Sequence, residues 1–251
     1  MRHYPQAPVP IKISIIVPAF NEEKLIAQSL AAMKEAAAAF TERGWEWELV
    51  VCDNNSKDRT SEIAKEAGAR VVFEPKNQIS RARNTGASIA QGEWFLFVDA
   101  DSHPSKELLA DLADTITAGR ALGGGAAVKL DQDIGRAGML AEFWNKLSRW
   151  QRWAAGSFVY CEANAFRELG GFSLELFASE EIDFSQRLKK LAKQRGREVI
   201  ILKKHPLITS ARKAHLYTKG EHVKFMLRTV FSRGKTLKQA ETAAIWYDGR
   251  R

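Results

Sequence analysis

Apolar and polar positions alternate along the first part of the chain in blocks that predict strands and helices in turn. Ile11 to Val17 is a β-branched run that stops at Pro18, as expected of a strand followed by a turn. Apolar residues then recur at steps of three and four from Ile26 to Phe40, and this pattern stops near Gly44. Such spacing is typical of an amphipathic helix. The chain therefore opens with a predicted strand, turn and helix.

The same alternation continues up to residue 98. The pattern predicts further strands at 48–52, 70–73 and 94–98, with helices at 57–67 and 77–91. Strands that alternate with helices favour an α/β fold with a mostly parallel sheet and helices on both faces. Open sheets of this kind bind ligands at the carboxyl ends of their strands. The polar residues that follow each predicted strand are therefore the first candidates for a site.

The strand predicted at 94–98 runs directly into Asp99-Ala100-Asp101. Residues two apart in an extended chain lie on the same side, so the two carboxylates can converge on one hard divalent cation. The alternative is that they form a turn or cap the helix predicted to begin at Lys106. In the metal interpretation, Asp101 is the direct ligand, and Asp99 contacts ribose or a metal-bound water.

Two other predicted strands also end in polar residues. The first is followed by residues 18–23, Pro-Ala-Phe-Asn-Glu-Glu, and the second by residues 53–56, Asp-Asn-Asn-Ser. Taken singly, Asn21 and Asn55 suit helix caps, and acids in a first helical turn suit the helix dipole. Taken together with the aspartate pair, these strand ends offer an aromatic ring for a base, a carboxylate for ribose hydroxyls and a metal site for a diphosphate.

Composition limits the class of protein. At 251 residues and 45% hydrophobic, the chain can bury the core of one large domain or of a domain with an added subdomain. Cys52 and Cys161 fall in apolar runs, which predicts buried thiols rather than a disulfide or a metal site. Residues 1–10 have no apolar run of signal-peptide length, and no stretch reaches eighteen apolar residues. We therefore expect a cytoplasmic protein, or one that is peripheral at the inner face of the membrane.

The net charge of +8 favours acidic partners such as nucleotides, anionic acceptors or a lipid surface. The basic residues are spread along the chain and form no recognised nucleic-acid-binding module, so no nucleic-acid partner is expected. After Thr218, an apolar helical stripe from Val223 to Phe231 is flanked by basic residues. This stripe predicts either a helix that closes the core or one that makes a peripheral membrane contact.

Four segments together resemble the large family 2 glycosyltransferases in order and spacing. They are 17–23 (Val-Pro-Ala-Phe-Asn-Glu-Glu), Asp53, 81–86 (Arg-Ala-Arg-Asn-Thr-Gly) and 99–101 (Asp-Ala-Asp). The resemblance implies the GT-A fold, a nucleotide-diphosphate sugar donor and a divalent metal, Mn²⁺ or Mg²⁺. The nucleotide-binding residues that it implies are Pro18, Ala19, Phe20, Glu22, Asp53, Arg81, Asp99 and Ala100. Arg83 competes with Arg81 for the contact near the base or diphosphate, and the alternative for each is a solvated charge on a helix face.

The second half contains a segment that resembles the family's approach to the reaction centre. Residues 161–172 end in Gly-Gly-Phe, where glycine lets the backbone approach a ligand closely. Residues 179–184 follow, at the place where the family usually shows Glu-Asp before a helix. Glu181 stands where the usual residue is Asp, and the resemblance implies that it is the catalytic base, with Glu180 as runner-up. The simpler alternative is that these acids only stabilise a helix N-terminus.

A third metal ligand in this family often comes from a histidine near the end of the catalytic domain. His215 follows an apolar strand-like segment and is the first candidate, while His205 and His222 are weaker alternatives. Imidazole suits Mn²⁺ better than Mg²⁺, which favours manganese.

The resemblance divides the chain into a GT-A catalytic domain at 1–217 and a basic amphipathic helical extension at 218–251. Within the domain, 11–101 is the nucleotide-sugar-binding half and 102–217 the acceptor and catalytic half. The implied reaction transfers a sugar from a UDP-sugar, or next a GDP-sugar, to a hydroxyl of a carbohydrate, lipid-linked or small-molecule acceptor, with inversion and with metal. A retaining GT-A transferase and a sugar nucleotidyltransferase are the alternatives. The first loop, however, lacks the Gly-rich phosphate cradle with a basic residue that a nucleotidyltransferase needs.

Overall fold

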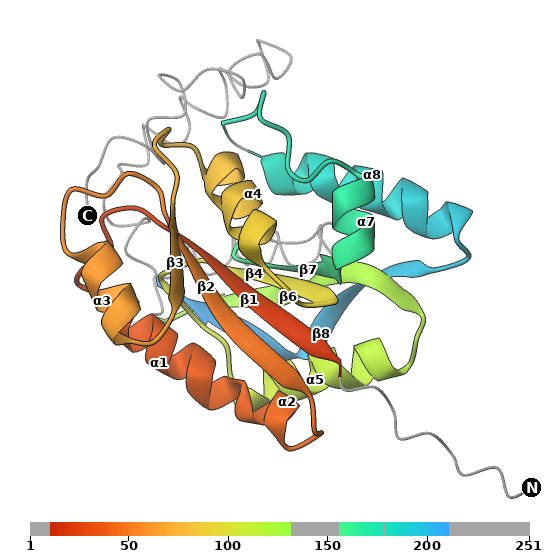
Figure 1. Ribbon diagram of the computed structural model, residues 1–251. Helices are drawn as coiled ribbons and strands as arrows, with labels where there is room; N and C mark the ends of the chain where they lie inside the picture. The colour runs from red at the N-terminus through yellow and green to blue at the C-terminus, as the bar shows by residue number, and fades with distance from the viewer. Residues whose placement is uncertain (1–10, 132–155, 178, 211–251) are drawn as a thin grey trace, which may run out of the picture.

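A computed structural model describes residues 11–131, 156–177 and 179–210 of the protein. Eight strands in these ranges form one sheet in the order β3-β2-β1-β4-β7-β6-β8-β5 (Figure 1). The strands are β1 (Lys12–Ala19), β2 (Glu46–Asp53), β3 (Arg70–Phe73), β4 (Trp94–Val98), β5 (Ser102–His103), β6 (Ala121–Leu130), β7 (Phe158–Glu162) and β8 (Glu198–Thr209). The helices are α1 (Ile26–Ala36), α2 (Ala38–Thr41), α3 (Thr60–Glu66), α4 (Ile79–Ile89), α5 (Lys106–Thr117), α7 (Ala163–Glu168) and α8 (Glu180–Gln194).

The sheet is parallel in its first half and mixed in its second. β3, β2, β1 and β4 run parallel to one another, whereas β7 is antiparallel to both of its neighbours, β4 and β6. β6 then pairs in parallel with β8, and β5 is antiparallel to β8. The predicted α/β fold is therefore confirmed, and the parallel order predicted from the βα alternation holds for the strands that carry this alternation.

Helices cover both faces of the sheet, as predicted. Along β1, Ile13, Ile15 and Val17 belong to a core with α1, α2 and α5, whereas Ile16 faces the opposite core with α4, α7 and α8. Figure 1 shows α4, α7 and α8 on one side of the sheet and α1, α2 and α5 on the other. This alternation follows from the two-residue period of a strand. None of the helices within the described ranges is long and apolar enough to cross a bilayer.

Three predicted helices differ in their bounds from the helices of the structure. The helix predicted over 26–40 breaks at Ala37 into α1 and α2. α4 begins at Ile79 rather than residue 77, because Gln78 is extended and its N–H donates to Asn54 Oδ1 at 2.9 Å. α3 begins only at Thr60. Its N-cap residue is Arg59 and that of α1 is Leu25, so neither Asn21 nor Asn55 caps a helix.

Both cysteines are free and buried, as predicted. Burial, with the nearby carboxylates of Glu74 and Asp53, raises the pKa of Cys52 to about 12. Burial also raises the pKa of Cys161. Both side chains therefore pack as small apolar groups.

Polar residues of α4 hold the loop that precedes α8. Asn84 accepts from the N–H of Phe172 and donates to its carbonyl, both at 2.9 Å. Gln78 Nε2 donates to the carbonyls of Leu174 and Leu176, again at 2.9 Å. The Gly-Gly-Phe turn is thus attached to α4 even though the two segments are about 90 residues apart in the sequence.

Gly171 should be less tolerant of a side chain than its neighbour Gly170. Both residues have φ of 72°, but a Cβ on Gly171 would lie 2.6 Å from Asn84 Oδ1, whereas one on Gly170 would have nothing within 4 Å. We expect Gly171→Ala to lower the free energy of unfolding by about 1–3 kcal/mol more than Gly170→Ala, because the alanine methyl displaces the Asn84 amide. Urea unfolding of both variants measures the difference. Equal losses would contradict the Asn84 contact.

Candidate functional site

The carboxyl ends of β1, β2 and β4 lie side by side at one edge of the sheet. Ala19 pairs in register with Asp53, and the Asn54 N–H donates to the Ala19 carbonyl at 2.8 Å. β4 is the next neighbour of β1 and ends at Val98, directly before Asp99. The three strand ends identified in the sequence are therefore brought together.

The loops after β1 and β2 are tied to each other by hydrogen bonds. Asn21 N–H donates to Ser56 Oγ at 3.0 Å, and Glu22 N–H donates to Thr60 Oγ1 at 2.8 Å. Asp53, which is buried, accepts from the Ser56 N–H at 2.9 Å through its Oδ1. Pro18 and Ala19 thus end β1 beside Asp53, and Phe20 and Glu22 follow on a cross-linked double loop, with Phe20 partly exposed.

Asp99 and Asp101 do not cap the helix that follows them. The N-cap of α5 is Ser105, whose hydroxyl accepts from the Leu108 N–H at 3.2 Å. Asp101 is buried and its carbonyl accepts from the Ser210 N–H at 3.1 Å, whereas the side chain of Asp99 is 20% exposed. The capping alternative is therefore removed, but the turn alternative is confirmed, since the Ser102 N–H donates to the Asp99 carbonyl at 3.1 Å. Ala100 between the two aspartates is buried.

Arg83 lies at the centre of the site and is almost completely buried, with 1% of its surface exposed. Its Nη1 donates to Glu180 Oε1 at 2.7 Å, and its Nη2 donates to Asp99 Oδ1 at 3.0 Å and to the Gly156 carbonyl at 2.7 Å. The guanidinium also lies 5.2 Å from the centre of the Phe172 ring. One side chain of α4 therefore joins the end of β4 to the start of α8.

Three carboxylates face this guanidinium, and they differ in their surroundings. Burial opposes the charge of Arg83, but Asp99, Glu180 and Glu181 outweigh it and hold the pKa of Arg83 above its ordinary value. Burial raises the pKa of Glu180 although Arg83 opposes the shift. Burial and the neighbouring Glu180 raise the pKa of Glu181 to about 8. Glu180 is 3% exposed, whereas Glu181 keeps more contact with solvent.

Other residues considered from the sequence lie apart from this centre. Arg81 is half-buried, and its Nε donates to Gln78 Oε1 at 3.1 Å near the start of α4. His205 pairs with Asp111 of α5 at 2.9 Å, so this weaker metal candidate is engaged elsewhere. His215 and His222 lie outside the described residues, as does the extension at 218–251.

The aspartate pair suits a hard divalent cation. Mg²⁺ in proteins is commonly bound through one or two carboxylates together with waters and substrate phosphates. Asp99 and Asp101 would supply such oxygens, and a nucleotide diphosphate would supply others. Across the described ranges, no three His, Cys, Asp or Glu side chains cluster as a complete protein-only metal site.

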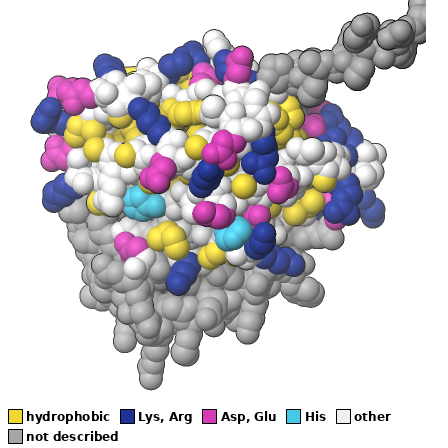
Figure 2. Space-filling model, turned by 90° about the horizontal axis from the view of Figure 1, so that it is seen from below, with side chains coloured by type: hydrophobic (Ala, Val, Ile, Leu, Met, Phe, Trp, Pro, Cys, Tyr) yellow, Lys and Arg dark blue, Asp and Glu magenta, His cyan; other side chains and the backbone are white. Residues whose placement is uncertain are grey.

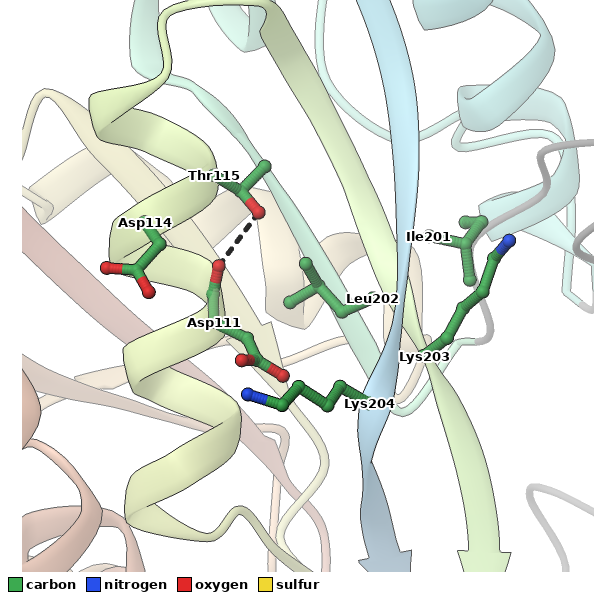
Figure 3. A pocket seen from close by; sticks show the side chains of 7 residues that line it. All are labelled: Asp111, Asp114, Thr115, Ile201, Leu202, Lys203 and Lys204. Atoms are coloured by element: carbon green, nitrogen blue, oxygen red, sulfur yellow. Dashed lines mark hydrogen bonds between the residues drawn. The ribbon is translucent and has the colours of Figure 1, made fainter.

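A separate hollow of about 360 Å³ lies between α5 and β8. Figure 3 shows its lining side chains, which include Asp111, Asp114, Lys203 and Lys204. Asp111 is paired with His205, and Asp114 accepts from Arg43 at 2.7 Å. α5 covers the face of the sheet opposite α4, so this hollow is distinct from the Arg83 site.

The sequence profile described as "Glycosyl transferase family 2" matches residues 14–169, which is more than half of the chain. The chain belongs to this family. The matched region contains the double loop, Arg83 and the aspartate pair, and it ends before Glu180.

Curated relatives are similar to part of this chain, and the similarity covers only part of each relative. The poly(ribitol-phosphate) β-N-acetylglucosaminyltransferase TarS of Staphylococcus aureus is 32% identical over 109 residues, which are 41% of this chain and 18% of TarS. The dolichol-phosphate mannosyltransferase of Pyrococcus furiosus is 30% identical over 114 residues, 43% of this chain and 31% of that protein. The matched segments thus span less than a third of these relatives.

Solved structures confirm the GT-A fold. The mannosyltransferase PcManGT from Pyrobaculum calidifontis, solved with GDP-Man and Mn²⁺, has a TM-score of 0.67 at 18% identity and covers 94% of this chain and 65% of its own. TarS residues 1–349 with UDP-GlcNAc has a TM-score of 0.62 at 19% identity and covers 95% and 71%.

The sequence predicted that the three polar strand ends lie together, but not that Arg83 connects them to α8. Arg83 and Glu180 are 97 positions apart in the sequence. Gly156 contributes only a backbone carbonyl, so its residue type does not indicate this contact. A second arginine, Arg187, donates to the carbonyls of Leu169 and Gly171 and so fixes the Gly-Gly turn to α8.

The raised pKa of Glu181 predicts a pH-dependent stability. In the absence of metal and nucleotide, the folded chain holds the Glu181 proton up to about pH 8, whereas the unfolded chain releases it near the ordinary pKa of 4.5. Between these values the folded state binds more protons, so its stability falls as pH rises. Glu181→Gln removes this titration, and its Tm advantage over the wild type should grow from about pH 5 to about pH 8.

Thermal unfolding at both pH values measures the Glu181 effect. Glu35→Gln, at an exposed position of α1, reports what the same exchange does away from the site. A Tm difference for Glu181→Gln that is constant or shrinks toward pH 8 would contradict the burial of this carboxylate.

Proposed function

We propose that this family 2 protein transfers a sugar from a nucleotide-diphosphate sugar to an acceptor hydroxyl, with a divalent metal and with inversion at the sugar. The observation that carries the proposal is the convergence of Asp99 and the α8 carboxylates on Arg83 at the carboxyl edge of the sheet, with Asp101 two residues after Asp99. This edge is where open α/β sheets bind ligands. A UDP-sugar is the first choice of donor and a GDP-sugar the second, and TarS and PcManGT were solved with one of each.

The donor nucleoside would bind at the double loop. Phe20 offers a partly exposed ring, and Asp53 has one carboxylate oxygen bonded to the Ser56 N–H. The cross-links between the loops hold these groups in place before the ligand arrives, which reduces the ordering cost of binding. Glu22 is buried at the base of the same loop.

Asp99 and Asp101 would hold the divalent cation, which offsets negative charge on the departing nucleoside diphosphate when it is bound. His215 is the proposed further ligand. The N–H of Ser210 donates to the Asp101 carbonyl, and His215 follows Ser210 by five residues in the sequence. Five residues span at most about 17 Å, so His215 is within reach of Asp101. Mn²⁺ is favoured over Mg²⁺ if an imidazole is a ligand.

Glu181 would act as the general base and Glu180 as its structural neighbour. Glu180 is buried and bound to Arg83, whereas Glu181 is the more exposed of the two and remains available to an acceptor. Its raised pKa makes the ionised form a stronger base. In a single displacement, the acceptor oxygen bonds to the anomeric carbon, the bond to the diphosphate breaks and the hydroxyl proton passes to Glu181, which inverts the anomeric configuration.

The described part of the face that carries α1, α2 and α5 has no basic stripe of the kind that binds nucleic acid (Figure 2). On the face that carries α1, α2 and α5, basic and acidic side chains are interspersed rather than gathered in a basic stripe (Figure 2). The acceptor itself would approach Glu181 beside the loop at 171–177, where Leu174 is 46% exposed. A carbohydrate, a lipid-linked sugar and a small hydroxyl compound all remain candidates.

Nucleotide binding tests the proposed function most directly. We expect UDP or a UDP-sugar with Mn²⁺ to raise the Tm of the protein, GDP to do so less, and dTDP least, because ligands that bind only the folded state stabilise it. The same panel of sugars is then assayed for release of free nucleotide, and the anomeric configuration of any product is read by NMR. Absence of stabilisation by every nucleotide would contradict the glycosyltransferase proposal, and a retained configuration would contradict Glu181 as the base.

Asp101→Ala should abolish transfer while leaving the fold intact. Loss of a carboxylate that holds the cation is expected to lower kcat by at least about 100-fold, because stabilisation of the leaving diphosphate is lost. Asp114→Ala is the matched control, since Asp114 is an exposed aspartate of α5 remote from the site. Turnover and far-UV circular dichroism are measured for both. An Asp101→Ala enzyme with near wild-type turnover would remove Asp101 from the site.

A further inference from the structure

Arg83 joins segments that come from three separate parts of the chain. Its guanidinium bonds to Asp99 after β4, to Gly156 before β7 and to Glu180 at the start of α8. With 1% of its surface exposed, it has no face to offer a bound nucleotide or acceptor. Any effect of Arg83 on transfer therefore has to pass through the groups that it holds.

We propose that Arg83 is a positioning residue that sets the placement of Glu181 relative to the donor-side carboxylate Asp99. This inference rests on the proposed function and adds to it a physical link between the donor-side carboxylate and the catalytic base. Glu180 makes that link, because it is ion-paired with Arg83. Because Glu181 directly follows Glu180 in the first turn of α8, the ion pair between Arg83 and Glu180 also fixes where Glu181 lies.

The first turn of α8 has no side-chain cap, and its other contacts come from Asp183, which pairs with Arg187, and from Phe184, which packs in the core. Its N-cap residue, Ser179, has φ of 61° and its side chain makes no capping hydrogen bond. A non-glycine residue in this left-handed region is strained and persists only when surrounding contacts impose it. The 2.7 Å ion pair between Arg83 and Glu180 is such a contact, and it holds the first residue of α8 in place where a side-chain cap is absent.

The backbone of Gly156 lies beside both Arg83 and Glu181. A Cβ at this position would lie 3.4 Å from Glu181 Cδ and 3.7 Å from Arg83 Nη2, so the backbone of Gly156 packs against both groups. Its carbonyl accepts from the same Nη2 that binds Asp99. The planar fork of arginine serves these acceptors at once, which the single ammonium of lysine cannot reproduce.

Arg197 offers a matched control at the other end of the sheet. It also binds a carboxylate, Glu162, at 2.8 Å, and it donates to the carbonyl of Ala121. The Nε atoms of Arg83 and Arg197 are both buried without a hydrogen-bond partner in the described part of the chain. Glu162 pairs with Trp94, at the opposite end of β4 from Asp99. Arg197 thus binds the same kinds of partner as Arg83, with 27% of its side chain exposed, but lies remote from the site.

The test compares Arg83→Gln, Arg83→Lys and Arg197→Gln in the full chain. Amide hydrogen exchange should rise by about tenfold or more in residues 180–184 of Arg83→Gln and stay unchanged there in Arg197→Gln, because only the first variant releases the start of α8. In steady-state kinetics, kcat should fall about 100-fold for Arg83→Gln and about tenfold for Arg83→Lys, with donor KM changed less than about threefold. Arg197→Gln should keep kcat within about twofold even where its Tm falls.

Two results would overturn the positioning role. One is exchange at 180–184 that is the same in Arg83→Gln as in the wild type. The other is an equal loss of kcat in Arg83→Gln and Arg197→Gln, which would mean general destabilisation. If Arg83→Gln does not fold, Arg83→Lys decides both points. A wild-type protein that binds no nucleotide and has no turnover would end the proposed function, while hydrogen exchange would still decide whether Arg83 holds α8.

Discussion

The buried guanidinium of Arg83 is the constraint on which the site depends. Burying a charge is costly unless partners compensate for it, and losing one partner of a buried ion pair leaves the other charge uncompensated. Here the compensation comes from Asp99, Glu180 and the Gly156 carbonyl, so the end of β4, the start of β7 and the start of α8 have to meet at one point. Gly86 lets α4 pack closely on the sheet, because a Cβ at this position would lie 2.6 Å from the side chain of Ile16. This close packing brings Arg83 within reach of its partners.

α4 therefore connects the two halves of the structure. Its apolar face packs on β1 and β2, which carry the predicted donor-side loops, and its polar residues reach the loop and helix of the second half. Beneath the guanidinium, an aromatic cluster that includes Phe97, Phe166, Phe172 and Phe184 supports the Gly-Gly-Phe turn. Rigid supports of this kind place catalytic groups more accurately than loops do.

The pattern of the sequence predicted the strands and helices well, because strong periodicity reflects burial on one face. β3 and β4 were predicted with their observed bounds, 70–73 and 94–98. Helix starts were less accurate, since Gln78 and Arg59 take part in loop contacts that no local pattern reveals. The same limit applies to the site. Asp53, Asp99 and Asp101 follow strands and could be predicted, but Arg83 has the same appearance in the sequence as the half-buried Arg81, and only the fold separates the two.

We infer that one buried cation links the proposed donor site at the strand ends to the proposed base on α8. A crystal structure with UDP and Mn²⁺ tests it most directly. The account predicts the diphosphate and metal beside Asp99 and Asp101, the base against the double loop at Phe20 and Asp53, and Arg83 still bonded to Glu180 with Glu181 facing the space beyond the diphosphate. A nucleotide bound away from this edge, or Arg83 released from Glu180 and bonded to the nucleotide, would contradict it.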